Sequence, residues 1–106
     1  KADMYLRIRP GTDGALALAM MNVIISENLY DKEFIKQHTF GFEKLVPHVQ
    51  KYTPEWAEEI TWVAAEDIRK LARLFANTKG ASIFQGTCTH DQTANGTQNS
   101  RDFSVL

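Results

Sequence analysis

The segment Ala15–Ile25, which reads ALALAMMNVII, is the most apolar run of the chain and restricts the folds that the chain can adopt. It is shorter than the roughly 20 residues that a membrane-spanning helix needs, and Asn22 interrupts it. A helix with apolar residues on so broad a surface must pack on more than one side. We therefore expect a buried core helix inside one globular unit, and no insertion into a membrane.

The residues before this run predict a short strand and a tight loop. Met4 to Ile8 alternate between apolar and charged side chains, and Pro10-Gly11 ends the alternation. Either Thr12 or Asp13 is then suited to be the N-cap of the apolar helix.

Capping residues and helical spacing predict further helices downstream. They are expected after Asp31, over Phe42–Tyr52, after Thr53-Pro54, over the segment that begins near Ala65, and over Asn95–Leu106. A second short strand is expected over Ala81–Phe84. The resulting order predicts an α/β fold, a partial Rossmann-like layer with two short parallel strands and about five helices.

Charge and cysteine content exclude several classes of function. The chain carries 12 basic and 13 acidic residues, a net charge of −1, so it has no long-range field that would attract nucleic acid. Cys88 is the single cysteine, so this chain can hold neither an internal disulfide nor an iron-sulfur cluster by itself. Cys88 and His90 form too weak a pattern for a thiolate nucleophile, and we assign no catalytic and no metal-binding residue.

Two polar loops would follow the two strands and open onto the same edge of a parallel sheet. The first contains Gly11, Thr12 and Asp13 at a helix start, where backbone N–H groups are free. A carboxylate there can accept paired hydrogen bonds from the N1–H and amino group of guanine, whereas it would repel phosphate. Alternatively, Asp13 is only a helix cap, a role worth about 1 kcal/mol. The second loop, Gly86–His90, carries hydroxyls and an imidazole that suit a polar ligand.

The order and spacing of four blocks carry a family resemblance. They read RIRPGTDGALALAMMNVIISENLYDKEFI, HTFGFEKLVPHVQKYTPEWAEEIT, AAEDIRKLARLFA and QGTCTHDQTANGTQNSR. Together they resemble an internal section of the molybdopterin oxidoreductases of the dimethyl sulfoxide reductase type, which include formate dehydrogenases and the tungsten enzyme acetylene hydratase.

The resemblance implies a cofactor and a set of residues that contact it. In this family a molybdenum or tungsten ion is held by two pyranopterin guanine dinucleotides. By resemblance, Gly11, Thr12 and Asp13 lie at a guanosine end, and Gly86, Thr87, Thr89 and His90 approach the pterin. The family's metal ligand and its iron-sulfur cysteines lie in segments that these 106 residues do not contain.

The resemblance also implies the biological setting of the chain. Residues 1–106 would be a single fragment of the cofactor-binding domain of a larger catalytic subunit, inactive alone, with the rest of that subunit and electron-transfer subunits as partners. A redox enzyme of the bacterial or archaeal cytoplasm is the favoured parent, with the periplasm as the other location. A non-redox acetylene hydratase-like enzyme and a ligand-free helical interaction module are the alternatives. Apolar surface left uncovered on the fragment would favour its self-association.

Overall fold

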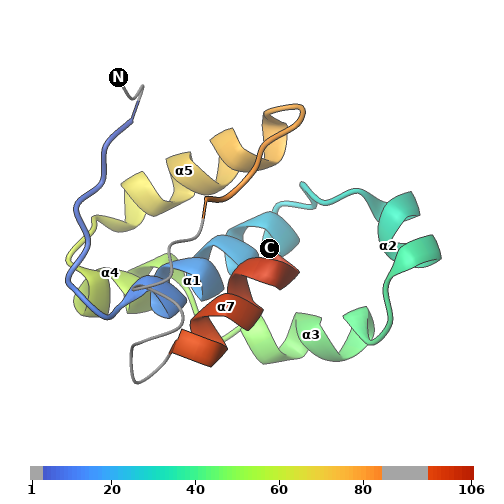
Figure 1. Cartoon of the computed structure of the whole chain (residues 1–106), viewed down its shortest axis with the longest axis horizontal. Coiled ribbons are helices and arrows are strands. Elements are labelled where there is room, and N and C mark those ends of the chain that lie inside the picture. The colour runs from blue at the N-terminus through green and yellow to red at the C-terminus, as the bar shows by residue number, and fades with distance from the viewer. Residues whose placement is uncertain (1–3, 85–95) are drawn as a thin grey trace.

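The computed structural model describes residues 4–84 and 96–106, which form helices joined by short connections (Figure 1). The helices are α1 (Asp13–Ser26), α2 (Lys32–His38), α3 (Phe42–Val49), α4 (Pro54–Thr61), α5 (Ala65–Asn77) and α7 (Gly96–Val105). The apolar helix α1 packs against α3, α4, α5 and α7. The expected core helix with partners on several sides is therefore confirmed.

Two apolar clusters hold the other helices onto α1. Ala19 lies in the first cluster, where its small side chain packs with Ala57 of α4 and Ile68 of α5. Met20 and Val23 lie in the second, against Ala72 of α5. Ala19, Ala57, Ile68 and Ala72 are fully buried, and alanine at these contacts lets the helix axes approach closely.

Asn22, which interrupts the apolar run, is buried and links α1 to the end of α3. Its Nδ2 donates to the carbonyl oxygen of Val49 over 2.9 Å and to that of Gln50 over 3.3 Å. The last carbonyl groups of a helix have no N–H donor within the helix to accept from, so they need donors from elsewhere when they are buried. The polar residue in the core therefore satisfies backbone groups of a neighbouring helix.

In the part of the chain that the structure describes, three side chains cap helix N-termini. Asp31 Oδ1 accepts from the Phe34 N–H over 3.0 Å, and Thr53 Oγ1 accepts from the Trp56 N–H over 3.2 Å, which confirms both expected caps. The third cap acts between helices, since Glu58 Oε1 of α4 accepts from the Ala65 N–H of α5 over 2.7 Å. This contact fixes the junction of α4 and α5, where Trp62 has a left-handed backbone with φ of 66°.

The expectation of an α/β layer was wrong, because the described residues contain no strand and are mainly helical. The alternation in residues 4–8 instead reflects an extended segment lying on helices. Leu6 and Ile8 pack against the cluster around Ala19, while Tyr5 and Arg7 point outward. A strand requires a neighbouring strand to pair its backbone. Among residues 4–84 and 96–106, the one backbone bond from this region to another element joins the Arg9 N–H to the Thr61 carbonyl, over 2.8 Å.

The second expected strand, Ala81–Phe84, also lacks a backbone partner among the described residues. Ala81, Ser82 and Phe84 are exposed, and only Ile83 is half-buried. A short apolar run by itself does not determine whether the segment pairs as a strand.

Candidate functional site

The loop that leads into α1 forms a tight turn closed by Thr12. The Thr12 N–H donates to the Arg9 carbonyl over 3.3 Å, and the Thr12 hydroxyl donates to the same oxygen over 2.5 Å. Gly11 has a φ of 81°, a left-handed conformation that glycine adopts without steric cost. The glycine is therefore explained by the turn itself.

Thr12 occupies the N-cap position of α1, but its hydroxyl does not cap the helix. The hydroxyl is directed to Arg9 instead, so it does not serve the N–H groups of the first turn. An α-helix leaves its first N–H groups without partners inside the helix, and they carry partial positive charge. The start of α1 therefore offers hydrogen-bond donors that its own cap residue does not use.

Asp13 is the first residue of α1 and is partly exposed. Within residues 4–84 and 96–106 its carboxylate takes part in no ion pair and no side-chain hydrogen bond. The alternative role of Asp13 as the N-cap is wrong, because Thr12 holds that position. The carboxylate is thus available as an acceptor at the end of the central helix.

Gly14, the next residue, is buried where α1 meets α7. The nearest side chains come from Asn99 and Asp102, one turn apart on α7. Asn99 is only 6% exposed, and the absence of a side chain on Gly14 leaves the space that its amide oxygen fills. The N-terminal end of α1 is therefore bordered by an amide and a carboxylic acid.

Asp102 has an unusual environment for a carboxyl group. Burial raises the pKa of Asp102 above its ordinary value, and attraction to Arg101 and His48 partly offsets that rise. The protonated form of Asp102 is therefore favoured more than in the unfolded chain.

The predicted site residues are only partly covered by the described structure. Gly11, Thr12 and Asp13 lie together at the start of α1. Gly86, Thr87, Thr89 and His90 lie outside the described residues. The sequence analysis did not identify Asn99 and Asp102, although polar residues three apart on a helix share one face and could have indicated a polar contact there.

The described residues offer neither a metal-ion site nor a helix that could cross a membrane. They contain no group of three or more His, Cys, Asp or Glu side chains that could hold a metal ion. None of their helices combines the length and apolar character that a bilayer span requires.

Several curated proteins are similar in sequence to this chain. The F420-dependent formate dehydrogenase subunit alpha of Methanocaldococcus jannaschii is 55% identical over 82 residues, which are 77% of this chain and 12% of that protein. Acetylene hydratase of Syntrophotalea acetylenica is 51% identical over 82 residues, covering 77% of this chain and 11% of the enzyme. Dimethyl sulfoxide reductase of Escherichia coli is 38% identical in an alignment that covers all of this chain and 15% of that protein.

A solved structure has the same arrangement. Acetylene hydratase from Pelobacter acetylenicus superposes with a TM-score of 0.94 at 43% identity, over 98% of this chain and 14% of that one. No protein-family model matches the chain. The chain thus spans about one eighth of the length of the first curated relatives, 12% in the case of formate dehydrogenase H of Escherichia coli.

These relatives are catalytic subunits of formate dehydrogenases, dimethyl sulfoxide reductases and acetylene hydratase, and they agree with the resemblance carried by the four sequence blocks. The chain belongs to the molybdopterin oxidoreductase family of the dimethyl sulfoxide reductase type and corresponds to a section of its catalytic subunits.

Proposed function

We propose that this chain is the part of a molybdenum or tungsten oxidoreductase that grips the guanosine and pterin parts of a pyranopterin guanine dinucleotide. We also propose that residues 1–106 are a single fragment of the cofactor-binding domain of a longer catalytic subunit. Its support is the similarity of 77% or more of the chain to catalytic subunits of which the matched section is only 12–15%.

The single observation that carries the proposal is the Asp13 carboxylate, which has no side-chain partner among the described residues, beside first-turn N–H groups of α1 that the Thr12 side chain does not cap. Guanine presents two adjacent donors, N1–H and the amino group, which match the two oxygens of a carboxylate. The N–H groups of the first helical turn can donate to further acceptors of the nucleotide. The residues present therefore fit the guanosine end of the cofactor.

Each residue of the turn has a separate role in this binding site. Asp13 accepts from the guanine edge, Thr12 fixes the turn through Arg9, and Gly11 allows the ligand to approach the backbone. Gly86, Thr87, Thr89 and His90 are proposed to contact the pterin. Asn99 and Asp102 hold the start of α1 in position through Gly14 and are positioning residues, not ligands.

The reaction itself belongs to the rest of the subunit. When bound, the cofactor supplies the metal centre of a redox enzyme, and the metal ligand and any iron-sulfur cluster are assigned to segments beyond these residues. Electron-transfer subunits would then be partners of the complete enzyme. We expect the isolated 106-residue chain to have no catalytic activity.

An acetylene hydratase-like parent is the second candidate, and the superposition with acetylene hydratase from Pelobacter acetylenicus favours it. The cofactor-gripping role of this section is the same for both parents. A ligand-free helical module is the remaining alternative, and it predicts that the chain ignores guanine nucleotides.

A titration of the isotopically labelled chain with GDP, followed by amide chemical shifts, tests the proposal. We expect the largest changes at Gly11, Asp13 and Gly14, with affinity for GDP at least about tenfold above that for ADP, since a site built for paired donors rejects a base that lacks them. Equal responses to GDP and ADP, or shifts confined to other elements, would contradict the guanosine role.

A further inference from the structure

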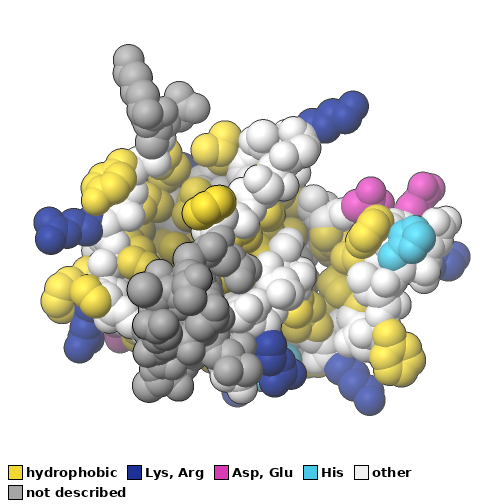
Figure 2. All heavy atoms as spheres, viewed as in Figure 1, with side chains coloured by type: hydrophobic (Ala, Val, Ile, Leu, Met, Phe, Trp, Pro, Cys, Tyr) yellow, Lys and Arg dark blue, Asp and Glu magenta, His cyan; other side chains and the backbone are white. Residues whose placement is uncertain are grey.

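Arg9, which opens the turn before α1, carries a positive charge that is held in place without being neutralised. Its guanidinium lies over the ring of Trp62, with the guanidinium carbon 5.3 Å from the ring centroid. Arg9 is exposed, and within residues 4–84 and 96–106 it forms no ion pair with a carboxylate. Figure 2 shows basic side chains next to hydrophobic ones at the edge of the molecule where α4 and the segment before α1 lie.

The backbone of Arg9 is fixed on both sides. Its N–H donates to the Thr61 carbonyl over 2.8 Å, and its carbonyl accepts from the Thr12 N–H over 3.3 Å. Gly11, the third residue of the turn, has a φ of 81°, as in a type II turn. Such a turn brings the Cα atoms of its first and fourth residues within about 7 Å of each other. Arg9 therefore lies at the same turn as Asp13, the residue proposed to bind guanine.

Trp62, which follows α4, is an unusual residue for its position. Its backbone has a φ of 66°, a left-handed conformation for which glycine is the common residue at the end of a helix. The side chain of Trp62 is 70% exposed, so burial in the core does not account for a large ring there. The contact with Arg9 gives the ring a role, because stacking on an aromatic face limits the conformations of a guanidinium before it binds a ligand.

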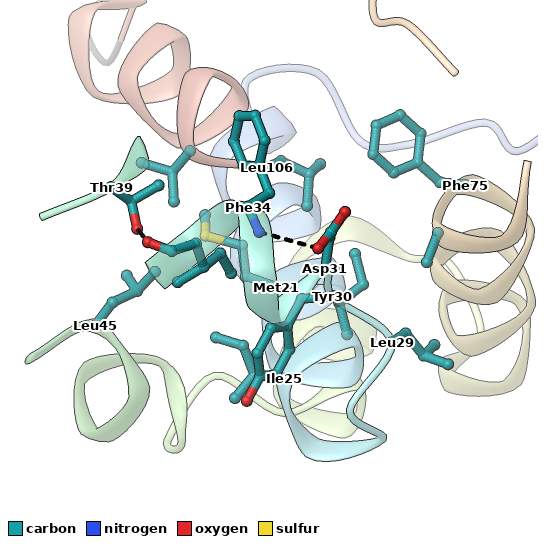
Figure 3. Close-up of a pocket in the computed structure, with 14 residues that line it drawn as sticks. Met21, Ile25, Leu29, Tyr30, Asp31, Phe34, Thr39, Leu45, Phe75 and Leu106 are labelled. Carbon is teal, nitrogen blue, oxygen red and sulfur yellow. Dashed lines mark hydrogen bonds between the residues drawn. The ribbon is translucent and has the colours of Figure 1, made fainter. Parts of the chain in front are cut away.

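The other end of α1 offers no comparable group. An apolar hollow of about 250 Å³ lies there, between α1, α2, α5 and the end of α7 (Figure 3). Among the described residues that line it, the one charged residue is Asp31, whose carboxylate would repel an anion. A cation beside a free acceptor is therefore a feature of the N-terminal end of α1.

This pair of charges suits the two parts of a nucleotide. A carboxylate matches the donors of guanine but repels phosphate, so a nucleotide bound at Asp13 requires a cation nearby for its phosphate groups. We propose that the guanidinium of Arg9, held by Trp62, binds the phosphate groups of the guanine nucleotide whose base Asp13 recognises. Arginine suits this role because its N–H groups bind phosphate oxygens in pairs. The phosphate contact rests on the guanosine role proposed above and extends it.

Titrations of the 106-residue chain with guanosine, GDP and inorganic pyrophosphate, followed by amide chemical shifts, test the phosphate contact. The variants are Arg9→Gln and Trp62→Gly, with Arg7→Gln as the matched control. Trp62→Gly should fold, because it removes the ring and introduces the residue that adopts a left-handed backbone without steric cost. Arg7 is an exposed arginine of the same segment that stacks on no ring within the described residues.

We expect the wild type to bind GDP at least about tenfold more tightly than guanosine or pyrophosphate, the gain from hydrogen bonds to a charged group. Arg9→Gln should weaken GDP binding at least about fivefold for the same reason. Trp62→Gly should weaken it about two- to threefold, because the guanidinium is then less ordered before binding. Both variants should bind guanosine as the wild type does, and Arg7→Gln should leave the affinities for all three ligands unchanged.

Equal affinities for GDP and guanosine, or equal losses in Arg9→Gln and Arg7→Gln, would overturn the phosphate role of Arg9. If guanosine binding were still lost in Asp13→Ala, the guanosine role would stand. Pyrophosphate binding as tight as that of GDP would also overturn the proposal, since the site would then bind an anion without recognising a nucleotide. GDP binding that depends on Arg9 but not on Asp13 would contradict the guanosine role alone. Absence of binding by all three ligands would overturn both roles.

Discussion

Gly14 and Asn99 are in contact so close that a methyl group on Gly14 would overlap the amide oxygen of Asn99. The Oδ2 atom of Asp102 would lie 3.3 Å from the same methyl group, so Asn99 has little freedom to move toward α7's next turn. The start of α1, which carries the proposed guanosine site, therefore lies directly against α7 at this contact.

Replacement of Gly14 by alanine should therefore destabilise the chain, although alanine is the better helix former. Overpacking of this kind costs about 1–3 kcal/mol, and we expect a net loss of unfolding free energy at the lower end of that range. Denaturant unfolding followed by circular dichroism measures it. The double variant Gly14→Ala, Asn99→Ala, in which the clashing amide is absent, should recover part of the loss. A Gly14→Ala chain as stable as the wild type would show that α7 does not pack against α1 as described.

The junction of α4 and α5 depends on Glu58, which accepts from the Ala65 N–H over 2.7 Å. Ala64, the N-cap residue of α5, provides no side-chain hydrogen bond. Glu58→Ala should lower the unfolding free energy by about 0.5–2 kcal/mol, the usual cost of losing a cap. The neighbouring Glu59→Ala is the control and should change it by less than about 0.5 kcal/mol, as exposed substitutions do. Equal effects of the two variants would contradict the capping role.

Asp102 should make stability depend on pH in a defined direction. Because burial raises its folded pKa, the native state binds this proton more tightly than the unfolded chain. Ionisation of the buried carboxyl group therefore lowers the unfolding free energy. This loss is absent below the ordinary aspartate pKa, grows as the pH rises toward the raised pKa, and is complete above it. Asp102→Asn removes this titration.

We therefore expect Asp102→Asn to melt at a higher temperature than the wild type at pH 7, with the difference shrinking below about pH 4, near the ordinary pKa of aspartate. Thermal unfolding of both proteins at a series of pH values checks this expectation. A difference in melting temperature that stays constant across the series would show that burial of Asp102 does not perturb its titration.

The sequence was a good guide to the helices and a poor one to the fold class. The caps at Asp31 and Thr53 and the core role of α1 follow from local rules, and the structure confirms them. The two strands failed because the alternation of residues 4–8 is produced equally by an extended segment lying on helices. Pairing depends on a distant neighbour, which no local pattern contains.

The site divides in the same way. The turn at Gly11 and Thr12 and the helix start at Asp13 could be predicted because a glycine turn before an apolar helix is a local pattern, and their role in binding stays a prediction. Asn99 and Asp102 could not, because their importance arises from the approach of α7 to Gly14, more than 80 residues earlier in the chain. Glu58 was missed for a related reason, since its partner belongs to the next helix.

The affinity of GDP for the wild type, Asp13→Ala and Asp67→Ala, measured by the same amide titration, tests the central claim most directly. Asp67 is the matched control, because it also lies in the first turn of a helix, α5, whose N-cap side chain makes no capping bond. The account predicts that Asp13→Ala weakens GDP binding at least about tenfold, the cost of lost hydrogen bonds to a charged group, while Asp67→Ala leaves it unchanged. Equal GDP affinities for all three chains would contradict the guanosine role of Asp13.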